Sequence, residues 1–304
     1  MDICDLYKLS NDKGKPGETR GRKAIGPSKD GSQLPKGEFV LFKRVLGLLH
    51  LLIIILFLVG QAPVAASEVF DLKNIEKGVL GVNRPLNDKK LKVMVQRDNT
   101  TYYYNLSGDK DVFPLQLGSG DYKLALLENL SGNSYAVKYN ENVQVKLAND
   151  KIPFLQSASP VYWEDHSKAA KLAQKLTENL EGDKEKARAI YDHIVDNIGY
   201  DKDKIDGLSS DYVPSVDDVL SSGKAICYDY AALYAAMLRS IDMPAKLVKG
   251  YKDDIDTYHA WNEVYLKDMG WVTVDTTYDA VLKENGTSCK FAKDVNEYKR
   301  EKEY

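Results

Sequence analysis

Three residues in the C-terminal half of the sequence have side chains that together could perform nucleophilic chemistry. The first is Cys227, in "GKAICYDYAALYAAMLRS" (223–240), where it follows a glycine-bearing turn and opens a run of helix-forming residues. The first turn of a helix is partly positive, which favours a thiolate over a thiol. Unpaired cysteines are usually buried packing residues, so Cys227 becomes a candidate nucleophile only if a base can reach it.

A base and a carboxylate follow on two segments that the pattern predicts to be adjacent strands. His259 lies near the start of "TYHAWNEVYL", and Asp275 lies in "WVTVDTTYD", after the tight connection "KDMG". Strands joined so closely pair antiparallel, so we expect His259 and Asp275 to come within contact distance. If Cys227 lies against this hairpin, the imidazole can accept the thiol proton while the carboxylate fixes the tautomer and stabilises the imidazolium.

These segments resemble those of a known family. "GKAICYDYA", "YHAWNEVYL" and "GWVTVDTTYD" are similar to the signature segments of the transglutaminase-like superfamily, and the resemblance extends over about residues 155–280. It implies a papain-like core with Cys227 as nucleophile, His259 as general base and acid, and Asp275 as the residue that orients the histidine. Chemistry of this kind needs no cofactor and no metal.

The sequence departs from the family pattern at one position and leaves one role unassigned. Ala225 stands where many relatives carry glycine, and its methyl group is expected to tighten the approach to the thiol. The backbone N–H of Cys227 is the natural first donor to an oxyanion. No side chain in the motifs matches a second donor.

The predicted activity is acyl transfer through a thioester, and the acceptor stays open. Water would make the protein a peptidase or amidase, and a lysine amine would make it a cross-linking transglutaminase. We favour hydrolysis because nothing in the sequence identifies an amine-binding tunnel. The expected substrates are proteins or peptides, with cell-wall peptides as one class. The alternatives are a non-catalytic cell-envelope binding or structural module on the same fold and a disulfide between Cys227 and Cys289.

Helices are predicted immediately before the three motifs. "SKAAKLAQKLTENL" (167–180) and "DKEKARAIYDHIVDNI" (183–198) repeat apolar residues at intervals of three and four, which indicates amphipathic helices. His166 and His193 lie in these charged surroundings and are expected to be solvated. With the hairpin, the helices predict an α+β catalytic domain over 155–304, in which N-terminal helices pack on an antiparallel sheet.

A small all-β domain is predicted over residues 67–154. Short alternating segments between about 89 and 147 are separated by "SGDK", "GSGD" and "SGN", which are typical turn sequences. The aromatic residues Tyr102, Tyr104 and Tyr122 could form a ligand-stacking surface, but their strand spacing favours a structural role. This region is similar to accessory domains of secreted bacterial members of the superfamily.

The N-terminal part of the sequence indicates export. Residues 45–60, "VLGLLHLLIIILFLVG", are uncharged and apolar, follow Lys43 and Arg44, and precede "QAPVAASE". This layout predicts a signal peptide over 45–66, with an uncleaved anchor as the alternative. Either would place the body outside the cytoplasm, secreted or anchored to the outer face of the membrane. Residues 1–44 are predicted to be a disordered extension.

Composition and charge exclude several classes of function. The 304 residues are 43% hydrophobic and 29% charged, as in globular proteins. Ten basic and six acidic residues precede position 67, so a chain of net charge −3 carries −7 in the remainder. This acidic body is poorly suited to nucleic acid. No spacing of His, Cys and carboxylates matches a zinc or calcium site, and membrane contact is expected only through the apolar segment.

Overall fold

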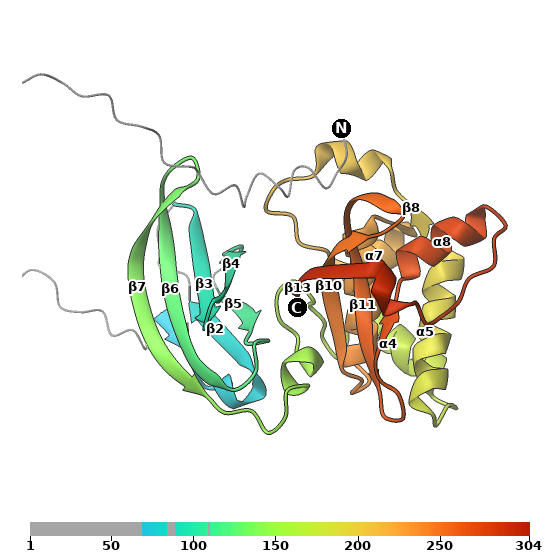
Figure 1. Cartoon of the computed structure of the whole chain (residues 1–304), viewed down its shortest axis with the longest axis horizontal. Coiled ribbons are helices and arrows are strands. Elements are labelled where there is room, and N and C mark those ends of the chain that lie inside the picture. Colours follow the sequence, from blue (N-terminus) through green and yellow to red (C-terminus); the bar gives the residue numbers. More distant parts are fainter. Residues whose placement is uncertain (1–68, 84–88, 109) are drawn as a thin grey trace, which may run out of the picture. The chain divides into compact units, whose positions relative to one another are not determined.

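The computed structural model describes residues 69–83, 89–108 and 110–304 (Figure 1). The predicted extension over 1–44 and the predicted signal or anchor over 45–66 lie outside the described residues. Within the described part, every helix is too short or too polar to cross a membrane. The fold is α+β: strands with one short 3-10 helix build the first part, and helices with a second set of strands build the rest.

The first part consists of two antiparallel sheets that share a hydrophobic cluster. The smaller sheet has the order β1-β2-β5, formed by β1 (Phe70–Asp71), β2 (Val79–Asn83) and β5 (Lys110–Pro114). The larger has the order β4-β3-β6-β7, formed by β3 (Leu91–Arg97), β4 (Thr100–Asn105), β6 (Gly120–Ser131) and β7 (Ser134–Val145). Alternate residues of β3 are buried because one face of the strand packs into the cluster.

This part differs from the sequence prediction in two ways. The segments "SYAVKY" and "NVQVKL" form the single strand β7, because no turn sequence separates them. Strands β1 and β2 add a second sheet, and they are too short to show a clear alternating pattern. Tyr102, Tyr104 and Tyr122 are buried in the shared cluster, which agrees with the structural role expected for them.

The second part combines helices with a four-stranded antiparallel sheet of order β12-β11-β10-β13. Its strands are β10 (Ala245–Lys252), β11 (Ile255–Leu266), β12 (Gly270–Val274) and β13 (Tyr298–Glu303). Its helices are α4 (Lys168–Thr177), α5 (Asp183–Asn197), α6 (Val216–Ser222), α7 (Cys227–Arg239) and α8 (Thr276–Glu284). Helices α4 and α5 confirm the two predicted amphipathic helices.

Helix α7 is the centre of this part. It packs on β10 and β11, and the other four helices contact it (Figure 1). All of its residues from Tyr228 to Arg239 are buried. A helix enclosed in this way can present chemistry only at an end, and Cys227 occupies its first position as a half-buried residue.

Candidate active site

A short strand that leads directly into α7 positions Cys227. Strand β9 (Lys224–Ala225) pairs in parallel with β8 (Gly199–Tyr200), so Tyr200 lies opposite Ala225. Ala225 is fully buried, two residues before the thiol. The first N–H groups of a helix have no partner within it, so α7 directs a partly positive end at Cys227.

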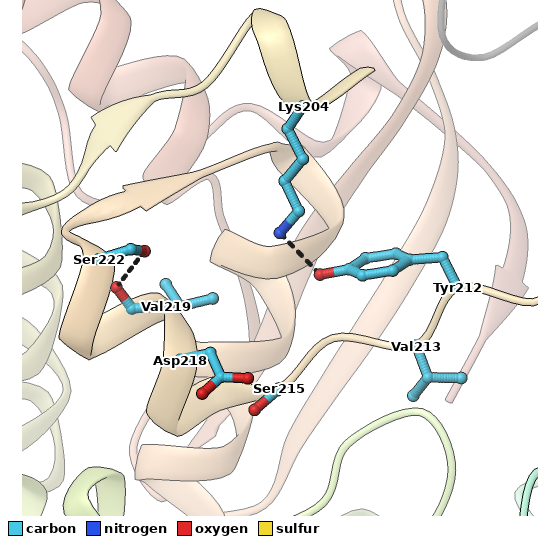
Figure 2. Close-up of a pocket in the computed structure, with 7 residues that line it drawn as sticks. All are labelled: Lys204, Tyr212, Val213, Ser215, Asp218, Val219 and Ser222. Carbon is cyan, nitrogen blue, oxygen red and sulfur yellow. Dashed lines mark hydrogen bonds between the residues drawn. The ribbon is translucent and has the colours of Figure 1, made fainter. Parts of the chain in front are cut away.

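The buried carboxylate of Asp229 binds the backbone at the start of the same helix. Asp229 accepts a hydrogen bond from the backbone N–H of Ile226 (3.0 Å) and is paired with Lys204 Nζ at 2.6 Å. The hydroxyl of Tyr212 donates to the other carboxylate oxygen. Lys204 also donates to Tyr212 at the edge of a cavity of about 350 Å³ (Figure 2). Asp229 is fully buried, and both of its carboxylate oxygens accept hydrogen bonds. This network therefore fixes the turn that leads into Cys227.

His259 and Asp275 are brought together as predicted, but Asp275 is not in a strand. His259 lies on β11, and its Nε2 is 2.8 Å from Oδ2 of Asp275. Strand β12 ends at Val274, and Asp275 is the N-cap of α8, where Oδ1 accepts the backbone N–H of Tyr278 at 3.0 Å. The prediction that Asp275 continues the strand is therefore wrong. Aspartate is among the preferred N-cap residues, and this was the local signal for the helix start.

Tyr298 is a further member of the site that the motifs did not reveal. Its hydroxyl donates to Asp275 Oδ2 at 3.1 Å from the first residue of β13. Its ring packs on Trp261, with ring centroids 5.1 Å apart, and Trp261 in turn stacks beside the imidazole of His259. Trp261 and Tyr298 therefore form an apolar cover over the His259–Asp275 pair.

The electrostatics of the pair favour the ionised forms. Burial opposes protonation of His259, but the charge of Asp275 and hydrogen bonds with Asp275 and Cys227 prevail and raise the pKa of the imidazole to about 10. Burial would likewise raise the pKa of Asp275, but the charge of His259 and hydrogen bonds from His259, Tyr278 and Tyr298 lower it. An imidazolium beside a carboxylate is thus the stable state near neutral pH.

The thiol and the imidazole share one cleft of about 230 Å³. Its lining residues come from β8, α7, β11 and α8, and they are Tyr200, Cys227, Ile255, Thr257, His259, Thr277, Tyr278 and Val281. Because Nε2 of His259 is engaged by Asp275, Nδ1 is the ring nitrogen left for the thiol. The site can therefore hold a carbonyl carbon against a sulfur nucleophile with a proton carrier beside it.

The raised pKa of His259 predicts a dependence of stability on pH. The folded value of about 10 exceeds the ordinary 6.5, so protonated His259 stabilises the fold fully below pH 6.5 and loses this contribution as the pH rises through 10. Urea unfolding of the wild type should show a free energy that falls over this range, and His259→Gln should flatten the fall. The exposed His166, which pairs with Glu164, provides the control, since His166→Gln should leave the profile unchanged.

Gly250 allows the close approach of β13 that places Tyr298. A Cβ at this position would overlap the carbonyl oxygen of Lys299 and lie 3.0 Å from the Trp261 ring. We expect Gly250→Ala to displace β13, to lower the free energy of unfolding by about 2 kcal/mol and to reduce activity, because crowding in a packed region forces the backbone to shift. Gly207→Ala, with nothing within 4 Å of the added Cβ, is the control in chemical unfolding. Equal stabilities of the two variants would contradict the prediction.

The remaining residues singled out in the sequence do not join the site. Cys227 and Cys289 are both free thiols, which rules out the disulfide alternative in this structure. His193 and His166 lie on helices and turns away from the cleft lining, and Ala225 is not part of that lining. Among the residues that the structure describes, no cluster of three or more His, Cys, Asp or Glu side chains could hold a metal ion.

The domain thus combines an antiparallel sheet, the enclosed helix α7, and a cysteine and a histidine that line one cleft, with Asp275 paired to the histidine. Residues 170–276, which contain all three, match the model of the transglutaminase-like superfamily. These residues form a transglutaminase-like domain, which is the part of the chain that the family model matches.

Individual relatives are distant. The uncharacterised protein YebA of Bacillus subtilis is 24% identical over 188 residues, a match that covers 55% of this chain and 25% of YebA. The chain thus spans about a quarter of that relative. A Cytophaga hutchinsonii protein proposed to be a cysteine protease is 20% identical with a TM-score of 0.38, over 66% of this chain and 71% of its own. The periplasmic domain of TgpA from Pseudomonas aeruginosa is 15% identical with a TM-score of 0.36, over 64% and 92%.

Proposed function

We propose that the protein is an extracytoplasmic thiol enzyme that acts on peptide or side-chain amides through a thioester on Cys227. The observation that carries this proposal is the position of a half-buried thiol at the positive end of α7, in one cleft with a His259 held by the buried Asp275. The superfamily match over residues 170–276 supports it. The extracytoplasmic location rests on the basic and apolar layout of residues 43–66.

In the first half-reaction, the thiol proton is already held on Nδ1 of His259, which is the protonated state that its raised pKa favours, and the sulfur reacts as a thiolate. The thiolate sulfur forms a bond to the amide carbonyl carbon, and the carbonyl electron pair moves to oxygen, where the backbone N–H of Cys227 can donate. The imidazolium then gives its proton to the departing nitrogen as the C–N bond breaks. Asp275 stays ionised and holds the ring in position throughout.

In the second half-reaction, the acceptor loses a proton to His259 and attacks the thioester carbonyl, and the C–S bond breaks to restore the thiol. Water as acceptor gives a carboxylic acid, and a primary amine gives a new amide. We expect water to be the main acceptor because nothing in the sequence identifies an amine-binding tunnel.

Mass spectrometry tests the proposal. The purified full chain is incubated with cell-envelope proteins or peptidoglycan peptides, with and without an isotopically labelled amine. Cleavage, deamidation and amine incorporation change the substrate mass in different ways, so one experiment separates hydrolysis from transfer. We expect cleavage or deamidation that disappears after pretreatment with iodoacetamide.

Cys289 provides an internal control for thiol activation. Peptide mapping after brief iodoacetamide treatment should show Cys227 alkylated faster than Cys289, whose pKa is raised by burial and by the nearby Asp279. An unchanged substrate together with a Cys227 no more reactive than Cys289 would contradict the proposal and favour a binding module.

A further inference from the structure

The hydroxyl of Thr277 is a buried polar group without a partner. Thr277 is the second residue of α8, two positions after Asp275, and is 4% exposed. Its Oγ1 is one of five buried side-chain polar atoms in the described part of the chain that accept or donate no hydrogen bond. An unpaired buried hydroxyl lowers stability, so a position that keeps one calls for an explanation.

Thr277 differs from the other four residues in its location. It lines the Cys227 cleft, whereas Gln116, Glu141, Trp163 and Asn262 are outside that lining. The residue that carries the unpaired hydroxyl therefore borders the site where a substrate would bind. A hydroxyl both donates and accepts, so it can pair with either end of a peptide group.

The rest of the cleft is uncharged apart from the reacting pair. Its other lining residues carry aliphatic, hydroxyl or phenol side chains. Close to these residues in sequence, Lys252 pairs with Asp254, and Asp254 also accepts a hydrogen bond from Tyr278 at 2.6 Å. His259 is likewise paired with Asp275. A charged substrate group would enter this cleft without a counter-ion of its own, which is unfavourable.

We propose that the cleft selects an uncharged acyl donor whose peptide group, next to the reacting carbonyl, hydrogen-bonds to the hydroxyl of Thr277. This inference rests on the proposed thioester chemistry at Cys227 and names its substrate class: peptides with a neutral residue on the acyl side of the reacting amide. Thr277 is then a specificity-determining residue whose hydrogen bond forms only with substrate.

Three chromogenic esters of equal acyl chain length test this directly. p-Nitrophenyl N-acetylglycinate carries the peptide group, p-nitrophenyl pentanoate replaces it with methylenes, and p-nitrophenyl hydrogen glutarate carries a negative charge. In the wild-type full chain we expect kcat/KM to be highest for N-acetylglycinate and lowest for glutarate. A glutarate ester that reacts as well as N-acetylglycinate would overturn the proposal without any variant.

The variant Thr277→Val removes the hydroxyl and keeps the shape of the side chain. We expect kcat/KM for N-acetylglycinate to fall about tenfold while that for pentanoate changes less than about twofold, because only the first ester loses a hydrogen bond. Thr277→Ser should restore the preference. The melting temperature of Thr277→Val should rise, since an unpaired buried hydroxyl has been removed.

Thr177→Val is the matched control. Thr177 is 6% exposed, but its hydroxyl donates to the carbonyl of Ala173 at 2.8 Å on α4. Its removal should lower the melting temperature and leave the kcat/KM of both esters unchanged. An equal loss for both esters in Thr277→Val would place the hydroxyl on the oxyanion, and no loss for either would make it structural; both results overturn the proposal. Ester hydrolysis that is no faster than in Cys227→Ala would instead overturn the thioester chemistry itself.

Discussion

Cys227→Ala is expected to lose turnover of every amide or ester substrate, by about 10³-fold or more, and to form no trappable thioester. The sulfur lines the cleft together with His259 and shares a hydrogen bond with it. The side chain is half-buried at a helix start, so the folded state should be retained, with a change in the free energy of unfolding of about 1 kcal/mol or less. Ester hydrolysis and intact-mass analysis of the acyl-enzyme measure the first effect, and urea unfolding measures the second.

Cys289→Ala is the matched control for this loss. Cys289 is also a half-buried free thiol, but its sulfur lies 3.4 Å from the carbonyl oxygen of Asp279 and is not part of the cleft lining. Its replacement should leave activity unchanged. If turnover were retained in Cys227→Ala and lost in Cys289→Ala, the nucleophile would be Cys289 and the assignment to Cys227 would be wrong.

Asp275→Ala is expected to damage both activity and stability. The substitution removes the partner of His259, the acceptor of the Tyr298 hydroxyl and the N-cap of α8 at once. Breaking a fully buried ion pair and a cap should lower the free energy of unfolding by about 3 kcal/mol. Loss of the orienting carboxylate should lower kcat/KM by about 10²- to 10⁴-fold.

Asp275→Asn removes the charge of the carboxylate but keeps one acceptor oxygen. Asparagine can still cap α8 through that oxygen, although it no longer accepts from Tyr298 on the other side, so stability should fall less than in Asp275→Ala. Removing the negative charge lowers the pKa of His259 from its value of about 10, so the imidazolium is lost at lower pH. The alkaline limb of the kcat/KM profile should therefore move to lower pH. A limb that stays in place would show that Asp275 does not control the protonation of His259.

Much of the candidate site was predictable because its signals are local. The helices over 167–180 and 183–198 follow from apolar periodicity, and the hairpin follows from the short "KDMG" connection. Periodicity did not distinguish the last strand residue from the first helix-cap residue at Asp275, because both have extended backbone angles. The error concerned one boundary and left the contact between His259 and Asp275 intact.

The sequence by itself determined the type and order of the three reacting side chains and the strand connection that brings two of them together. Only the tertiary structure decided which groups support them. Tyr298 hydrogen-bonds to Asp275, 23 residues away in sequence, and Lys204 to Asp229, 25 residues away. The hydroxyl of Thr277 has no hydrogen-bond partner among the groups packed around it. These relations depend on strand register and on how β13 and α8 close over the sheet. Local propensity does not encode them, because each is set by contacts between segments distant along the chain.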